Sequence, residues 1–170
     1  MPEVDLTVEV CGMAGDGTIA AGGLLNEAMS LGGFSVMGFD SYPAEIRGFG
    51  RCVTRSRIGD SEILALVEET HVLISLNDAE SKSRVQFLAR RPAIFFDSNP
   101  SVYHEEKDSL AAMLEPDAML FGIPMTDLAA AASGSARGRN LSALGGFAAV
   151  CGVSLELFHS AITRKFQAKG

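Results

Sequence analysis

Cysteine is scarce in this sequence, and its scarcity excludes several kinds of site. The three cysteines, Cys11, Cys52 and Cys151, lie far apart, and no two have the C-x-x-C spacing that zinc or an iron–sulfur cluster needs. An odd number of widely spaced cysteines is also not a disulfide framework. We therefore expect no metal site, and buried or nearly buried thiols in a reducing cytoplasm.

Positive charge is also scarce, and no apolar run is long enough to span a membrane. The chain has 14 lysines and arginines against 21 acidic residues, which argues against a general nucleic-acid-binding protein. The N-terminus, MPEVDLTVEV, has acidic residues where a signal peptide needs basic ones. The longest uncharged apolar stretch, NLSALGGFAAVCGVSL, is too short and too rich in glycine to cross a bilayer. We predict a soluble, cytoplasmic protein with no nucleic-acid or membrane partner.

The three histidines form no arrangement suited to hydrolysis. His71 falls at a predicted strand start, His104 in a loop and His159 in a helix. No Cys–His, Ser–His or acid–histidine cluster is evident among them. This argues against a self-contained hydrolase, and we assign no catalytic residue to the chain.

The sequence does contain a regular succession of short apolar runs and helical patterns. The expected strands are Val4–Cys11, Phe34–Phe39, Arg51–Arg57, His71–Leu76, Ala93–Asp97 and Ala118–Ile123. Helical spacing covers Asp16–Leu31, a segment opening at Asp78, Thr126–Ala132, Leu141–Val150 and Leu155–Gln167. Continuous apolar strands alternating with helices predict a three-layer α/β/α fold with a mainly parallel, Rossmann-like sheet, as one domain over residues 1–170. The strand Arg51–Arg57 has no helix before it, so it is either antiparallel or at an edge.

Polar and glycine-rich residues follow the predicted strands, at the end where such sheets bind ligands. GMAGDG follows the first strand and DSYPAEIRG follows the second. Asn77–Asp78 and Ser98–Asn99 follow two later strands. This edge of the sheet is therefore the candidate site.

The glycine loop GMAGDG has two interpretations. Backbone amides and the helix dipole at such a strand-to-helix turn attract anions, which favours a phosphate site. The loop lacks the Gly-Lys-Ser/Thr ending of a P-loop and the G-x-G-x-x-G spacing, which favours a tight turn with no ligand. Asp16 or Thr18 is expected to cap the helix, and a capping carboxylate would already occupy the position of the anion.

Arginine is concentrated in one window despite the acidic composition. Residues 39–57, FDSYPAEIRGFGRCVTRSR, contain Arg47, Arg51, Arg55 and Arg57. The planar guanidinium suits phosphate, carboxylate or an acidic protein surface. The alternative is a solvated loop in which Glu45 and Arg47 form a local ion pair of little energetic weight.

Several segments taken together resemble the gamma subunit, or gamma domain, of the 2-oxoacid:ferredoxin (acceptor) oxidoreductases. They are GMAGDG, AGGLLNEAMSLGGFSVMGFDSYPAEIRGFGRCVTRSRIG, LISLN and ARGRNLSALGGFAAVCGV. The resemblance covers about residues 5 to 168. Its most specific signals are the glycine loop joined to SYPAEIRG, and Asn140 with Leu144–Gly145.

The resemblance implies a subunit of an enzyme that converts a 2-oxoacid such as pyruvate or 2-oxoglutarate to an acyl-CoA. In this family thiamine diphosphate (TPP) and the Fe–S clusters lie on other subunits, and the gamma unit packs on them and helps accommodate coenzyme A (CoA). The implied partners are catalytic alpha and beta subunits and a ferredoxin-like delta subunit, with a homodimer for the isolated chain. The site residues that the resemblance carries over are Gly12, Gly15, Gly17, Ser41, Tyr42, Pro43, Glu45, Arg47, Gly48 and Asn77.

The resemblance leaves the substrate subclass and two other functions open. Asp16 stands where many relatives have Gln or Glu, and RGFGRCV replaces the usual RGG continuation. One alternative is an interaction module without a ligand, and another is a free-standing nucleotide- or flavin-binding protein. Within the arginine window, Arg47 is the residue we expect to bind the ligand, whereas Arg51, Arg55 and Arg57 are expected to contact another subunit.

Overall fold

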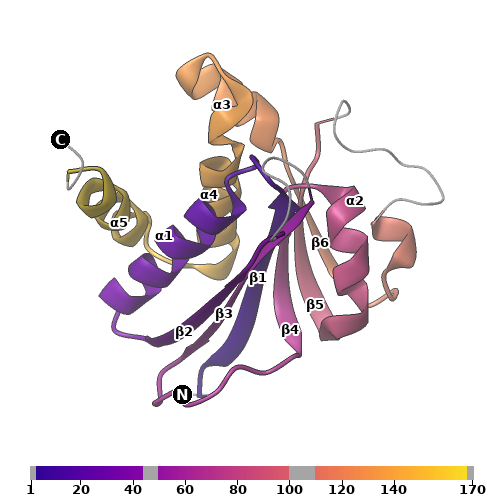
Figure 1. Ribbon diagram of the computed structural model, residues 1–170, viewed down its shortest axis with the longest axis vertical. Helices are drawn as coiled ribbons and strands as arrows, with labels where there is room; N and C mark the ends of the chain where they lie inside the picture. The colour runs from indigo at the N-terminus through magenta and orange to yellow at the C-terminus, as the bar shows by residue number, and fades with distance from the viewer. Residues whose placement is uncertain (1–2, 44–49, 100–109, 168–170) are drawn as a thin grey trace.

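The computed structural model describes residues 3–43, 50–99 and 110–167, and its framework is one six-stranded sheet (Figure 1). The strand order is β2-β3-β1-β4-β5-β6. Strands β1, β4, β5 and β6 are parallel, whereas β3 runs antiparallel to both of its neighbours, β1 and β2. The strands are β1 Asp5–Met13, β2 Ser35–Ser41, β3 Arg51–Gly59, β4 Thr70–Ser75, β5 Leu88–Asp97 and β6 Met119–Ile123.

Helices cover both faces of this sheet (Figure 1). One face carries α1 Thr18–Leu31, α4 Arg139–Cys151 and α5 Leu155–Gln167, and the other carries α2 Asp78–Ser81 with the 3₁₀ helices η1 Lys82–Phe87 and η2 Ala111–Met113. Helix α3, Met125–Ser133, and η3, Ala136–Gly138, pack against α4 beyond the carboxyl end of the sheet. The predicted three-layer α/β fold is confirmed, and β3 is antiparallel but internal, because β2 takes the edge. No helix within the described ranges is long and apolar enough to cross a membrane.

The alternation of residues along β1 divides the core in two. Val8 and Val10 are buried with Leu25 in the larger cluster, between the sheet and α1, α4 and α5. Cys11, on the opposite face of the strand, is buried with Leu73 in the smaller cluster on the α2 side. Apolar burial on both faces stabilises the central position of β1.

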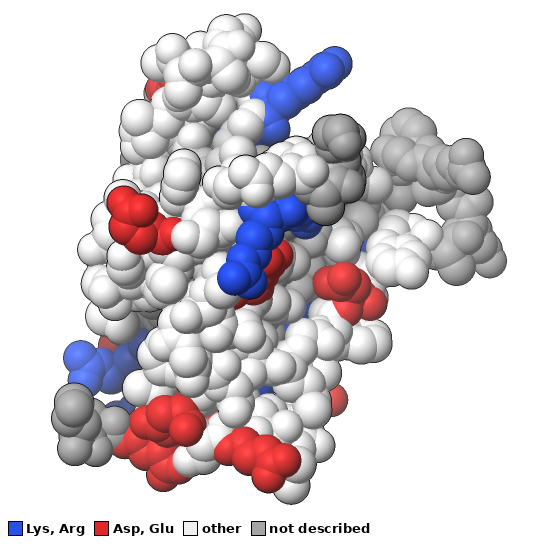
Figure 2. All heavy atoms as spheres, turned by 90° about the vertical axis from the view of Figure 1, so that its left-hand side faces the viewer, with Lys and Arg blue, Asp and Glu red and all other residues white. Residues whose placement is uncertain are grey.

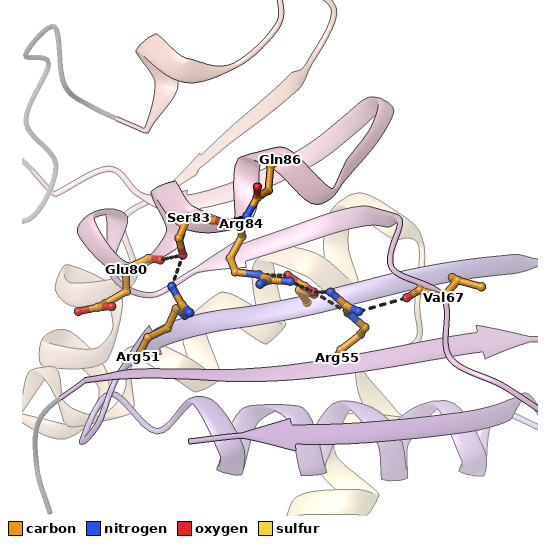
Figure 3. Close-up of polar contacts among 8 residues, drawn as sticks. Arg51, Arg55, Val67, Glu80, Ser83, Arg84 and Gln86 are labelled. Carbon is orange, nitrogen blue, oxygen red and sulfur yellow. Dashed lines mark hydrogen bonds and ion pairs between the residues drawn. The ribbon is translucent and has the colours of Figure 1, made fainter. Parts of the chain in front are cut away.

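Glu9 is a buried charge in this strand, since its carboxylate has 0% exposure. Arg55 of β3 donates from Nε to Glu9 Oε1 at 2.6 Å, and Arg84 of η1 donates to both carboxylate oxygens at 2.9 Å (Figure 3). The Arg84 guanidinium also lies over the Phe87 ring, 4.2 Å from its centroid. We call Glu9, Arg55 and Arg84 the buried ionic network. These ion pairs link η1 and β3 to β1.

Replacing Glu9 tests the importance of the buried ionic network. Glu9→Gln keeps the side-chain volume but leaves two guanidiniums without a counter-charge inside the protein, and we expect a loss of about 3–5 kcal/mol in unfolding free energy. The measurement is urea denaturation, followed by circular dichroism. Asp5→Asn is the matched control, since Asp5 lies on the same strand and pairs with Arg57 at 2.7 Å but has a half-exposed side chain. Equal losses in the two variants would contradict the account.

Candidate functional site

The glycine loop joins β1 to α1 at the carboxyl end of the parallel strands. Gly15 and Gly17 have φ angles of 102° and 79°, which few residues other than glycine adopt. Gly17 is at the N-cap position of α1, and no side chain caps this helix. The predicted cap by Asp16 or Thr18 is therefore wrong. Asp16 Oδ2 instead accepts a hydrogen bond from the Met13 amide at 2.8 Å, and the Thr18 hydroxyl is buried close to Gly12.

The amino-terminal end of α4 holds this loop from 123 residues away. Arg139 Nη2 pairs with Asp16 Oδ1 at 2.5 Å, and Asn140 Nδ2 donates to the Gly17 carbonyl oxygen at 3.1 Å. A Cβ atom on Gly17 would lie 2.5 Å from Asn140 Nδ2, so glycine is required both for its φ angle and for this close approach. We call these two contacts the α4 clasp. They neutralise Asp16 and fix the start of α1.

A shallow depression of about 260 Å³ lies beside the first turn of α1. Its lining residues are Met13, Gly15, Gly17, Thr18, Ile19, Ala20 and Cys52. The first turn of α1 contains no acidic residue, so its amide groups keep the positive end of the helix dipole unmatched. Lys165 of α5 lies close by and donates to the Ala20 carbonyl oxygen at 3.4 Å. The uncapped amides and this ammonium make the depression suited to an anionic group.

The residues that follow β2 lie next to the glycine loop. The Ala14 amide donates to the Gly50 carbonyl oxygen at 2.9 Å, and a Cβ on Gly50 would lie 2.6 Å from Pro43 Cγ. Ser41 and Tyr42 are exposed at this position, with Tyr42 67% exposed. The two segments that the sequence singled out are therefore neighbours in the fold.

The remaining predicted site residues have other positions. Glu45, Arg47 and Gly48 lie outside the described residues. Asn77 follows β4 and accepts a hydrogen bond from the Glu80 amide at 3.3 Å, so its side chain caps α2. Leu76, immediately before it, bonds to the Cys11 carbonyl oxygen, which brings this strand end close to the glycine loop.

The arginines of β3 are bonded within the chain rather than displayed as a surface. Arg55 belongs to the buried ionic network. Arg57 pairs with Asp5 and also donates to the Ala65 carbonyl oxygen at 2.8 Å. Arg51 donates to Ser83 of η1 (Figure 3). Their intramolecular bonds give these arginines a role in the fold, and the expected contact with another subunit stays a prediction.

The surface on the side of α1 and α5 carries charges of both signs. Figure 2 shows basic side chains in separate places on this face, among acidic and uncharged ones, and not as one continuous patch.

The cysteines and acidic groups of the described residues form no metal-binding cluster, and two of the thiols are buried. Cys11 and Cys52 are buried, as expected, whereas Cys151 at the end of α4 is exposed. Burial raises the pKa of the Cys11 thiol to about 11, which keeps it protonated and poorly nucleophilic at neutral pH. Residues 3–43, 50–99 and 110–167 hold no group of three His, Cys, Asp or Glu side chains that could bind a metal ion.

Arg139 is the residue of the site that sequence reasoning missed. Its position directly before Asn140 in the segment ARGRN was the available signal, because the resemblance had already marked Asn140. The pairing with Asp16 spans 123 positions and has no local pattern.

Comparison with known proteins gives a family match over most of the chain. A family model described as pyruvate ferredoxin/flavodoxin oxidoreductase matches residues 7–170. No curated protein sequence matches.

Several solved structures share the fold at low sequence identity. One is the 2-oxoglutarate:ferredoxin oxidoreductase of Magnetococcus marinus, which was solved with 2-oxoglutarate, coenzyme A and succinyl-CoA bound. Its TM-score is 0.83 at 23% identity, and the match covers 98% of the present chain. The present chain spans only 28% of the length of the Magnetococcus marinus chain. The pyruvate oxidoreductase subunit PORC of Thermotoga maritima has a TM-score of 0.77 at 23% identity, covering 95% of this chain and 85% of that one. The gamma subunit of a keto/oxoacid ferredoxin oxidoreductase from Geobacter sulfurreducens has a TM-score of 0.70 at 22% identity, covering 94% and 85%.

The α4 clasp predicts different costs for two neighbouring glycine substitutions. Gly15→Ala meets no atom within 4 Å, so only its positive φ opposes the change, at about 1–2 kcal/mol of unfolding free energy. Gly17→Ala has the same conformational cost and in addition collides with Asn140, so it should cost more. The double variant Gly17→Ala/Asn140→Ala should cost less than the sum of the two single changes, measured by urea denaturation. Strict additivity would show that the contact between loop and helix is unimportant.

Proposed function

Since the chain belongs to the pyruvate ferredoxin/flavodoxin oxidoreductase family, we propose that it is the gamma subunit of a multi-subunit 2-oxoacid:ferredoxin (acceptor) oxidoreductase. The observation that carries this proposal is the family match over residues 7–170, nearly the whole chain. The complex would decarboxylate a 2-oxoacid oxidatively to an acyl-CoA in the cytoplasm. TPP and the Fe–S clusters would be held by the catalytic and ferredoxin-like subunits, and this chain would contribute to assembly and to the accommodation of CoA.

The glycine loop is the part of the chain that we propose to face CoA. CoA carries a pyrophosphate and a ribose phosphate, and the first turn of α1 offers uncapped amides beside the 260 Å³ depression. The α4 clasp supports this role, because Arg139 neutralises Asp16 and so removes the one carboxylate of the loop that would repel a phosphate. The Magnetococcus marinus enzyme, which shares this fold, was solved with CoA bound.

The segment after β2 extends the proposed site. Tyr42 presents an exposed ring next to the glycine loop, where it can stack on the adenine of CoA or on a side chain of a partner. Arg47 and Glu45 belong to the same segment and are part of the proposal on the basis of the sequence motif alone. Gly12, Gly15 and Gly17 give the loop its close approach and its exposed amides.

A charge placed in the first turn of α1 tests the CoA site. Ala20 is exposed and lines the depression, so Ala20→Glu would put a carboxylate among the free amides. We expect the KM for CoA of the reconstituted complex to rise about tenfold, which corresponds to about 1.4 kcal/mol of lost binding. The fold should be unharmed, because an acidic residue stabilises the start of a helix.

Ala20→Gln is the matched control, since it has the same size without the charge. It should leave the KM for CoA within about twofold of that of the natural protein. An unchanged KM in Ala20→Glu, with the variant still in the complex, would remove the glycine loop from the CoA site. Failure of the tagged natural chain to recover subunits that contain TPP and Fe–S clusters would overturn the gamma-subunit assignment itself.

A further inference from the structure

Strand β5 contains a strained bulge at Arg90–Arg91. Thr70 of β4 pairs with Leu88 and Val72 pairs with Ala93, so residue 71 alone faces the four residues 89–92. Arg91 has a φ of 57°, and no other non-glycine residue in the described ranges has a positive φ. The following residue is Pro92, which further restricts the backbone of the residue before it. A bulge of this kind redirects side chains, and such strain gathers at functional positions.

Arg90 and Arg91 have no role in the fold that would explain the strain. Both are exposed, and among the described residues neither side chain has a hydrogen-bond or ion-pair partner. In contrast, five other arginines have partners in the chain: Arg51, Arg55, Arg57, Arg84 and Arg139. The bulge thus presents two unpaired guanidiniums in a chain with a net charge of −7.

A groove of about 640 Å³ runs along this bulge. Arg90 and Arg91 line it, together with Glu115 and Asp117 from the segment before β6. Apolar side chains contribute the rest of the lining, among them Met113, which is 49% exposed. The groove lies at the amino end of the parallel strands, so it is at the opposite edge of the sheet from the glycine loop.

The groove is continuous with the open edge of the sheet. Ala93, directly after the bulge, pairs with Met119, the first residue of β6. In the described residues β6 is the last strand of the sheet on this side, and Met119 and Leu120 are 45% and 47% exposed. An apolar edge strand of this kind readily accepts another strand.

We propose that this surface, which consists of the Arg90–Arg91 bulge, the groove and the edge of β6, docks an extended acidic segment of another subunit of the complex. The proposal rests on the gamma-subunit function proposed above. The segment adds main-chain hydrogen bonds to β6 and directs carboxylates to Arg90 and Arg91. Glu115 and Asp117 would repel a dense polyanion such as a nucleotide, whereas a polypeptide can present apolar groups and amides to them. The mixed charge of the groove therefore favours a polypeptide whose carboxylates reach the two arginines while uncharged residues pass Glu115 and Asp117.

Charge reversal of the bulge tests this docking surface. The variant Arg90→Glu/Arg91→Glu is compared with Arg164→Glu, which reverses one exposed arginine on α5. The measured quantity is the Kd between the gamma chain and the assembled remaining subunits, by biolayer interferometry at two salt concentrations. We expect the double variant to weaken binding at least tenfold, the control to stay within twofold, and the salt dependence to shrink in the double variant.

A second variant distinguishes a loss of docking from a loss of folding. Arg91→Gly suits the positive φ, so the melting temperature should stay the same or rise, while the affinity for the other subunits falls. Unchanged affinity in both variants overturns the docking surface but leaves the gamma-subunit function in place. No binding by the natural chain overturns both. A dimer of the natural chain that the double variant dissociates would make a second copy the occupant, and would also overturn the proposal.

Discussion

The buried carboxylate of Glu9 is the interaction on which the arrangement of this protein depends. A charge without exposure to solvent must be paired, and its two partners come from different elements, the neighbouring strand β3 and the 3₁₀ helix η1. Pairing therefore fixes where β3 lies in the sheet and where η1 crosses its face. It also accounts for one arginine of the arginine-rich window, because Arg55 is needed as a partner of Glu9 inside the protein.

The site depends on a second long-range constraint, between the glycine loop and α4. Asp16 would be an unfavourable neighbour for an anionic ligand, but Arg139 neutralises it and leaves the first turn of α1 free. Gly17 allows α4 to approach closely enough for this bond to form. The loop is thus held in place by its own chain before any ligand or partner is bound.

Local patterns were sufficient to predict most of the fold. The period-two alternation of β1 and the helical spacing of α1, α4 and α5 identified these elements within a few residues of their ends. The α2 segment was harder, because its single α-helical turn continues as a 3₁₀ helix. Residues 88–92 were not predicted as strand. Their sequence, LARRP, has a proline and no apolar alternation, and the backbone forms a bulge there.

The site was predictable only in part. The glycine loop and the segment SYP follow strands that run in the same direction, so their position at one edge of the sheet could be inferred, although the antiparallel β3 lies between the two strands. The partners of Asp16 and Glu9 could not, because each bond joins residues far apart in sequence. Nothing in the local sequence marks Glu9 as a buried charge, because η1 and its Arg84, which cover it, come 75 positions later in the chain.

The central claim is that the glycine loop and the first turn of α1 face CoA within an assembled 2-oxoacid oxidoreductase. Hydrogen–deuterium exchange of the complex, with and without CoA, measures this most directly. The account predicts that CoA slows exchange of the amides of residues 13–20, while the amides of α5 near Arg164 are unaffected. Exchange in residues 13–20 that is the same with and without saturating CoA would contradict it.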